Sequence, residues 1–136
     1  MISTKGRYAL RVLIDLADQG DGARVPLKDI AGRQEISEKY LQQIVRPLVA
    51  GGLVVGASGK RGGYALTRRP EEYVVLDVLE LVEGTIAPVA CLAKGAEPCE
   101  RAATCKTLPM WKGVYEHELE YYGSITIATL QRGMSL

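Results

Sequence analysis

The order of elements between residues 27 and 66 constrains the fold of this chain more than any other feature. Residues 27–34 and 38–50 carry apolar side chains at helical spacing, with a tight turn at Glu35 and Ile36 and the N-cap residue Ser37 between them. Two short apolar runs around a glycine-rich tip follow at 53–66 and predict a β-hairpin. Helix, turn, helix and hairpin in this order predict a winged helix-turn-helix domain. We therefore expect a mainly α-helical chain with one small β-hairpin wing.

The helix predicted over 38–50 has two chemically different faces. Its apolar face consists of Leu41, Ile44, Val45 and Leu48. The opposite face carries Lys39, Gln42, Gln43 and Arg46. Gln and Arg side chains can form paired hydrogen bonds to base edges in the major groove of DNA. A solvated surface helix is the alternative, although such helices more often carry Glu–Lys pairs. Pro47 lies inside the pattern and is expected to kink or end the helix locally.

The predicted hairpin tip, residues 58–63, places Lys60 and Arg61 among glycines that allow a close approach of the backbone. The two cations can meet phosphates or a narrow minor groove. A nucleotide-binding loop is a poor alternative, because the pattern is not GxxxxGK[ST] and no helix follows it directly.

The distribution of charge divides the chain into two halves. Residues 1–70 hold twelve Lys and Arg against six Asp and Glu, whereas residues 71–136 hold five against ten. A basic half suits a phosphate-binding surface, and an acidic half would stay away from DNA. We therefore predict a DNA-binding domain at 1–70 and a second region at 71–136.

Several classes of protein are not expected. The sequence has no run of about 18 apolar residues that would predict a membrane span. The N-terminal segment lacks the apolar core and cleavage site of a signal peptide, so we expect a cytoplasmic protein. No Ser–His–Asp set, second histidine or nucleotide loop points to an enzyme.

Five further segments complete the predicted organisation. They are a helix at 3–19 that Ser3 or Thr4 can cap, a helix at 74–83, an irregular segment at 85–109, a helix at 110–122 and a short terminal element at 124–131 that is helical from Thr126. The helix at 110–122 carries one stripe of Trp111, Val114, Tyr115, Glu118, Leu119 and Tyr122, apolar except for the glutamate. Because a winged-helix unit already has its own core, this stripe predicts a homodimer interface with two-fold symmetry.

The irregular segment contains all three cysteines of the chain. Cys91, Cys99 and Cys105 follow the spacing C-x7-C-x5-C among small residues. Thiolates are the ligands of iron–sulfur clusters, and small residues let a loop wrap around such a group. A structural zinc site and plain or redox-reactive thiols are the alternatives. His117, the only histidine, lies about 18 Å along a helix from Cys105 and is not expected to join the cysteines.

An ordered set of short motifs covers nearly the whole chain and resembles the family of the regulators IscR, NsrR, RirA and CymR. The motifs are Ser3-Thr4-Lys5-Gly6-Arg7-Tyr8-Ala9-Leu10, Ile36-Ser37, Tyr40-Leu41-Gln42-Gln43, Gly51-Gly52-Leu53-Val54, Arg61-Gly62-Gly63-Tyr64, Val82-Glu83-Gly84 and Ile125-Thr126-Ile127-Ala128-Thr129-Leu130. The resemblance implies a dimeric winged-helix repressor or activator that binds an imperfect palindrome of double-stranded DNA. We predict DNA contacts from Ser37, Lys39, Tyr40, Gln42, Gln43, Arg46, Lys60, Arg61 and Gly62.

The resemblance also bears on the cysteines. Cluster-binding members of the family hold a [2Fe-2S] or [4Fe-4S] cluster through three cysteines that match Cys91, Cys99 and Cys105. This chain has Leu108 where IscR-like members place a histidine ligand, and Arg7 where other members supply a carboxylate from the partner chain. The fourth ligand and the cluster type are therefore open. CymR-like members lack these cysteines and respond through a partner enzyme. A regulator without a cluster, controlled by thiol redox or a protein partner, is thus the alternative.

Overall fold

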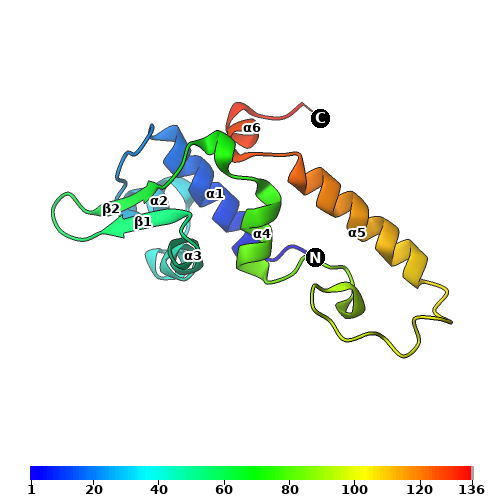
Figure 1. Cartoon of the computed structure of the whole chain (residues 1–136). Helices are drawn as coiled ribbons and strands as arrows, with labels where there is room; N and C mark the ends of the chain where they lie inside the picture. The colour runs from blue at the N-terminus through cyan, green and yellow to red at the C-terminus, as the bar shows by residue number, and fades with distance from the viewer. Residues whose placement is uncertain (136) are drawn as a thin grey trace.

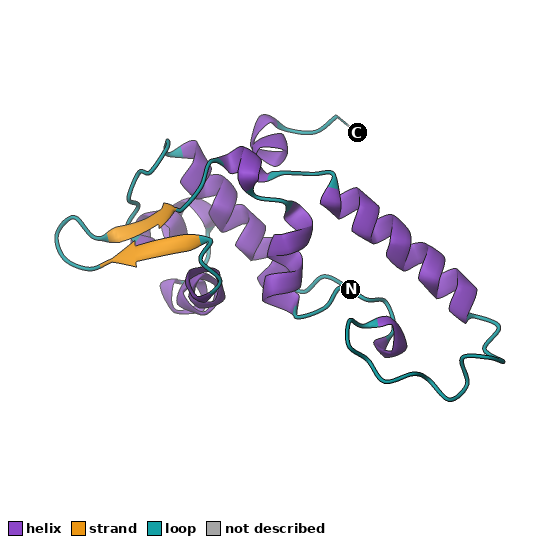
Figure 2. Ribbon diagram, in the orientation of Figure 1, coloured by secondary structure: helices purple, strands orange, loops and turns teal. Residues whose placement is uncertain are grey.

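The computed structural model describes residues 1–135 and confirms a mainly helical chain with one two-stranded hairpin (Figures 1 and 2). In chain order the elements are α1 (Thr4–Asp18), α2 (Leu27–Gln34), α3 (Glu38–Ala50), β1 (Val54–Ala57), β2 (Gly63–Leu66), the 3₁₀ turn η1 (Pro70–Glu72), α4 (Val75–Glu83), the 3₁₀ turn η2 (Ala90–Leu92), α5 (Leu108–Gly123) and α6 (Ile127–Arg132). This is the predicted winged helix-turn-helix order. In Figure 1 the wing lies at one end of the molecule, while α5 runs alongside the compact body at the other.

The main hydrophobic core forms where α1 packs against α2 and α3. Leu13 of α1, Ile30 of α2, and Leu41 and Ile44 of α3 are fully buried in it. The apolar faces predicted for these helices are therefore the faces that the fold buries. Burying such side chains stabilises the fold by roughly 1.5–3 kcal/mol each.

The same core takes in residues from beyond position 70. Tyr73, Val78 and Ile127 are buried in it, and the N–H of Ile127 donates to the carbonyl of Tyr73 at 2.9 Å. The end of the chain therefore returns to the helices of the DNA-binding half. The division into 1–70 and 71–136 stays a prediction about function, because residues on both sides share one core.

Tyr73 also fixes the base of the wing. Its hydroxyl accepts hydrogen bonds from the N–H groups of Thr67 (2.9 Å) and Arg68 (3.2 Å), and it donates to the carbonyl of Leu53 (2.7 Å). The two chain segments that enter and leave the hairpin are thus joined at one buried side chain.

Three local expectations differ from the structure. Pro47 does not end α3, which continues to Ala50, and the carbonyl of Pro47 accepts from Gly51 N–H at 2.9 Å. The helix predicted at 110–122 begins at Leu108, because Pro109 falls in the first turn, where its missing N–H costs no helical hydrogen bond. Ser3 occupies the N-cap position of α1, but its hydroxyl donates to Glu83 and does not cap the helix. The cap predicted at Thr126 is present.

Asp15 is the one buried charged residue of the described chain, with 3% of its surface exposed. It forms a bidentate ion pair with Arg33, with nitrogen–oxygen distances of 2.8–3.3 Å. It also accepts a hydrogen bond from Gln34 Nε2 at 2.8 Å. The hydrogen bond with Asp15 raises the pKa of Arg33 above its usual value. This network joins α1 to the end of α2 and so fixes the position of the turn before α3.

We expect Asp15→Ala to destabilise the fold by about 2–3 kcal/mol, because it leaves the donors of Arg33 and Gln34 unpaired. Half-exposed Arg33 can turn toward water, so the loss of stability is smaller than for a buried charge left without a partner. Urea unfolding with an unchanged m-value measures the effect. Asp18→Ala, at an exposed position of the same helix, is the control. Equal midpoints for the two variants would contradict the assignment.

Candidate DNA-binding surface and cysteine loop

The exposed face of α3 carries the side chains predicted to read DNA. Lys39, Gln42, Gln43 and Arg46 are all exposed, and α3 begins at Ser37, whose hydroxyl accepts from the Tyr40 N–H at 3.2 Å. The buried opposite face fixes the rotation of α3. The helix therefore presents two amides and two cations together to the solvent.

The wing is joined to the segment before α2 as well as to its own partner strand. Tyr64 of β2 exchanges two backbone hydrogen bonds of 2.8 Å with Val25, and within the hairpin Tyr64 pairs with Gly56. Gly63 has φ of +138°, and a side-chain carbon there would lie 2.6 Å from the Val25 carbonyl. Only glycine fits this position, which explains one of the two adjacent glycines of the motif.

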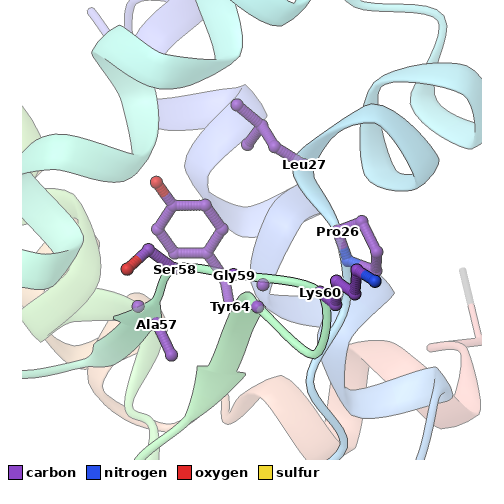
Figure 3. Close-up of a pocket in the computed structure, with 10 residues that line it drawn as sticks. Pro26, Leu27, Ala57, Ser58, Gly59, Lys60 and Tyr64 are labelled. Carbon is purple, nitrogen blue, oxygen red and sulfur yellow. The ribbon is translucent and has the colours of Figure 1, made fainter.

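Two clefts border the wing. The cleft in Figure 3 has a volume of about 650 Å³ and lies between the hairpin tip and the start of α2, with Pro26, Leu27, Lys60 and Tyr64 among its lining residues. A second cleft of about 510 Å³ separates α3 from the hairpin, and Gln42 and Tyr64 are among its lining residues. At the hairpin tip Lys60 and Arg61 are exposed, and Gly62 is half-buried. The structure thus brings the predicted α3 and wing residues to one side of the molecule.

These placements predict different roles for α3 and the wing. Gln43→Ala should weaken binding to the cognate operator by about 1–3 kcal/mol and leave random DNA nearly unaffected, because base contacts specify sequence. Lys60→Ala should weaken both about equally and flatten the salt dependence. Anisotropy titrations on an operator selected from a random library and on an unselected duplex measure both effects. Unchanged operator affinity in both variants would refute these roles.

The side chains of the stripe predicted on α5 lie in two different environments. Tyr115, Leu119 and Tyr122 pack against a second core cluster of the same chain, which contains Leu79 and Ile125. These three half-buried side chains therefore contact the protomer's own core, which the helical pattern alone does not predict. Val114 is 41% exposed, and Trp111 and Glu118 are partly exposed.

The outward face of α5 forms a shallow apolar groove of about 540 Å³. Its lining residues are Pro109, Met110, Gly113, Val114, His117, Glu118, Tyr121 and Tyr122. Met110 and Tyr121 are more than half exposed. One carboxylate oxygen of Glu118 is buried and has no hydrogen-bond partner within the described residues. Burial, followed by the neighbouring Glu118 charge, raises the pKa of Tyr122.

The three cysteines lie in the loop between α4 and α5, at the end of α5 far from α6 (Figure 1). All three are free thiols; Cys91 and Cys99 are exposed and Cys105 is half-buried. Cys99 and Cys105 line one cleft of about 570 Å³ together with Arg101 and Lys106. Over residues 1–135, no three His, Cys, Asp or Glu side chains are already grouped as metal ligands. Holding a metal group would therefore require the loop to close.

Cys105 has the most distinctive environment of the three. Its sulfur lies 3.4 Å from the Thr107 hydroxyl. Hydrogen bonds from Thr107, above all from its side chain, lower the pKa of the Cys105 thiol, and the charge of Arg101 adds a smaller effect in the same direction. A lowered pKa favours the thiolate, which is the form that binds metals and reacts with oxidants.

The other candidate ligands are separate from this cleft. His117 lies on α5, where its Nδ1 is 2.7 Å from the Gly113 carbonyl, and it lines the apolar groove. Glu97 and Glu100 are exposed on either side of Cys99 in the sequence.

Sequence reasoning assigned no role to Glu83, the last residue of α4. Its carboxylate accepts from both the N–H and the hydroxyl of Ser3, at 2.8 Å each, and lies so close to Gly6 that a methyl group there would displace it. The loop that carries the cysteines starts immediately after Glu83, at Gly84 and Thr85. The motif containing Glu83 was visible in the sequence, but its partner is 80 residues away.

No helix within residues 1–135 is long and apolar enough to span a membrane.

Comparison with known proteins gives a consistent result across the whole chain. Residues 2–133 match the Rrf2 family model, described as an iron-dependent transcriptional regulator. Protein rrf2 of Nitratidesulfovibrio vulgaris is 36% identical over 99% of this chain and 89% of its own. The HTH-type transcriptional regulator IscR of Xenorhabdus nematophila is 33% identical over 99% of this chain and 81% of its own. The structure of CymR, the global cysteine regulator of Bacillus subtilis, superposes with a TM-score of 0.79, at 34% identity, covering 99% of this chain and 98% of CymR. The chain therefore belongs to the Rrf2 family of winged-helix, DNA-binding transcription regulators.

Proposed function

We propose that this chain is a homodimeric regulator whose affinity for DNA depends on an iron–sulfur cluster, [2Fe-2S] or [4Fe-4S], held by Cys91, Cys99 and Cys105. The observation that carries the proposal is the gathering of three free thiols in one loop. Thiolates are the usual protein ligands of such clusters, so the chemistry of the donor set fits. The similarity to IscR and to an iron-dependent family supports the same assignment.

The loop is connected to the DNA-binding helices through its first residues. When bound, the cluster would cross-link three points of the loop. Glu83, directly before the loop, holds Ser3 at the start of α1, and α1 packs against both α2 and α3. A change in the shape of the loop can therefore favour one position of α1 and its neighbours over another, which shifts the population of binding-competent protein.

Three thiolates leave one coordination position to another ligand. Glu97 and Glu100 are our candidates within the loop, because both flank Cys99 and are exposed. A site without a fourth thiolate loses its metal more readily than a buried four-thiolate site. We propose that this lability is the switch, with loss of the cluster as the signal.

The homodimer is proposed on the outward face of α5. The groove around Val114 and Tyr121 has the apolar character of an interface core and lies apart from the α3 face. A two-fold axis there would present two copies of α3 to an imperfect palindrome, since palindromic operators match the symmetry of dimeric proteins.

A regulator controlled by its thiols, without a cluster, is the second candidate. One observation favours control by the thiols: Cys99 and Cys105 share a cleft with two cations. The similarity of the fold to that of CymR favours a regulator without a cluster more generally. In this case oxidation of the thiols, and not metal loss, would change DNA affinity.

Anaerobic purification and reconstitution, followed by iron and sulfide quantification and Mössbauer spectroscopy, test the proposal. A brown protein with both elements, whose operator affinity changes when the cluster is removed, is expected. Protein that takes up no iron, but whose operator affinity changes on thiol oxidation, would support the second candidate. An aerobic absorption spectrum of freshly purified protein gives a first indication.

A further inference from the structure

A basic face of α1 is not used by the surfaces described above. Thr4, Arg7, Tyr8 and Arg11 occur at helical spacing and therefore share one side of α1. This side faces the beginning of α3, because the rings of Tyr8 and Tyr40 are in edge-to-face contact, with centroids 5.9 Å apart. Tyr40 itself lies in the first turn of α3, beside the exposed Lys39.

Both arginines of this face lie near the Tyr8 ring. The guanidinium carbon of Arg11 is 4.9 Å from the ring centroid, and that of Arg7 is 5.9 Å away. Arg11 is held in place because its Nε donates to Gln34 Oε1 at 3.0 Å and its Nη2 donates to the Gln34 carbonyl. Arg7 is exposed, with a hydrogen bond to the Thr4 hydroxyl at 3.2 Å.

The charges on this face have no acidic partner. Within residues 1–135 the ion pairs are Asp15–Arg33 and Arg69–Glu72, which leave Arg7 and Arg11 uncompensated. The carboxylate of Glu83, at the start of α1, hydrogen-bonds to Ser3 and lies against Gly6. An uncompensated pair of cations, of which Arg11 is held in place, lies with two aromatic rings beside α3, and such a cluster suits a polyanion.

We infer that the Arg7–Arg11 face of α1 contacts the DNA backbone beside the bases read by α3, with Arg7 binding a phosphate directly. The inference rests on DNA binding through α3. The N-terminal end of a recognition helix enters the major groove, so the sugar-phosphate strand at the edge of that groove passes close to whatever packs against that end. Here that element is α1, joined to α3 through Tyr8 and Tyr40. Arg7 is free to reach a phosphate, while Arg11 supplies charge from a fixed position.

Salt titration of binding to a random-sequence duplex tests the inference without knowledge of the operator. Arg7→Gln should lower affinity about 3- to 10-fold. It should also reduce the slope of log affinity against log salt by about 0.9 per protomer, because binding releases fewer counterions when one phosphate contact is lost. Arg7→Lys should keep most of the slope, since the charge remains. Lys112→Gln, which removes an exposed charge on α5, should leave both quantities unchanged.

The possible outcomes distinguish a failure of this inference from a failure of the DNA-binding assignment. A wild-type protein that fails to bind the duplex contradicts the DNA-binding assignment. A wild type that binds, with an unchanged slope in Arg7→Gln, overturns the inference alone, as does an equal loss of slope in Arg7→Lys. Because Arg7 is exposed, the unfolding temperatures of both variants should match the wild type. Should Arg7→Gln fail to fold, Arg7→Ala, which removes the same charge, takes its place in the titration.

Discussion

Replacement of Cys99 by alanine is expected to abolish iron and sulfide incorporation completely. The loop supplies three thiols, so the loss of any one leaves too few ligands for a cluster. Cys91→Ala and Cys105→Ala should have the same effect. Iron and sulfide assays after anaerobic reconstitution, with Mössbauer spectra, measure the loss. Operator affinity of each variant should equal that of wild-type protein stripped of its metal.

His117→Ala is the matched control, because His117 lies on α5 and faces the apolar groove, away from the cysteine cleft. It should retain full iron content. A Cys99→Ala protein that keeps its iron would overturn the proposed ligand set. Zinc uptake that requires the three cysteines and His117 would replace it with a structural zinc site.

Val114→Asp is expected to convert the proposed dimer to monomer, with a large loss of operator affinity. An aspartate at this position would place an unpaired carboxylate from each protomer in the apolar seam, which should raise the dimer dissociation constant by about 100-fold or more. Loss of the second half-site contact should then weaken operator binding by a factor on the order of 10²–10⁴. Sedimentation velocity gives the assembly state, and anisotropy gives the affinity.

The structure explains why Val114, and not Leu119, is the residue to replace. Leu119 belongs to the same predicted stripe, but it packs inside the protomer, so a charge there would disturb folding as well as assembly. Val114 is exposed, so its replacement should leave the unfolding temperature of the monomer nearly unchanged. Lys112→Asp, on a polar part of α5, is the control and should remain dimeric. A fully dimeric Val114→Asp protein would exclude this face as the main interface.

Elements with a local pattern could be predicted from the amino-acid sequence. The spacing of Leu41, Ile44 and Leu48 predicts both the presence of α3 and the face it buries, because a helix repeats every 3.6 residues and apolar side chains avoid water. The same reasoning found the wing from its glycine-rich tip. It also found the position of the cysteines in a segment without periodicity, and the two residues Gln42 and Gln43 on an exposed surface.

Which surfaces contact one another became clear from the folded chain. The pairing of Glu83 with Ser3 and the contact of Tyr8 with Tyr40 join positions far apart in the chain. No local pattern encodes these contacts, because they depend on how the helices pack. The stripe on α5 shows the same limit: its spacing marks apolar residues, but Leu119 packs against the protomer's own core while Val114 stays exposed. Periodicity fixes which side chains share a helix face, whereas the partner of that face is fixed by the packing of the whole chain.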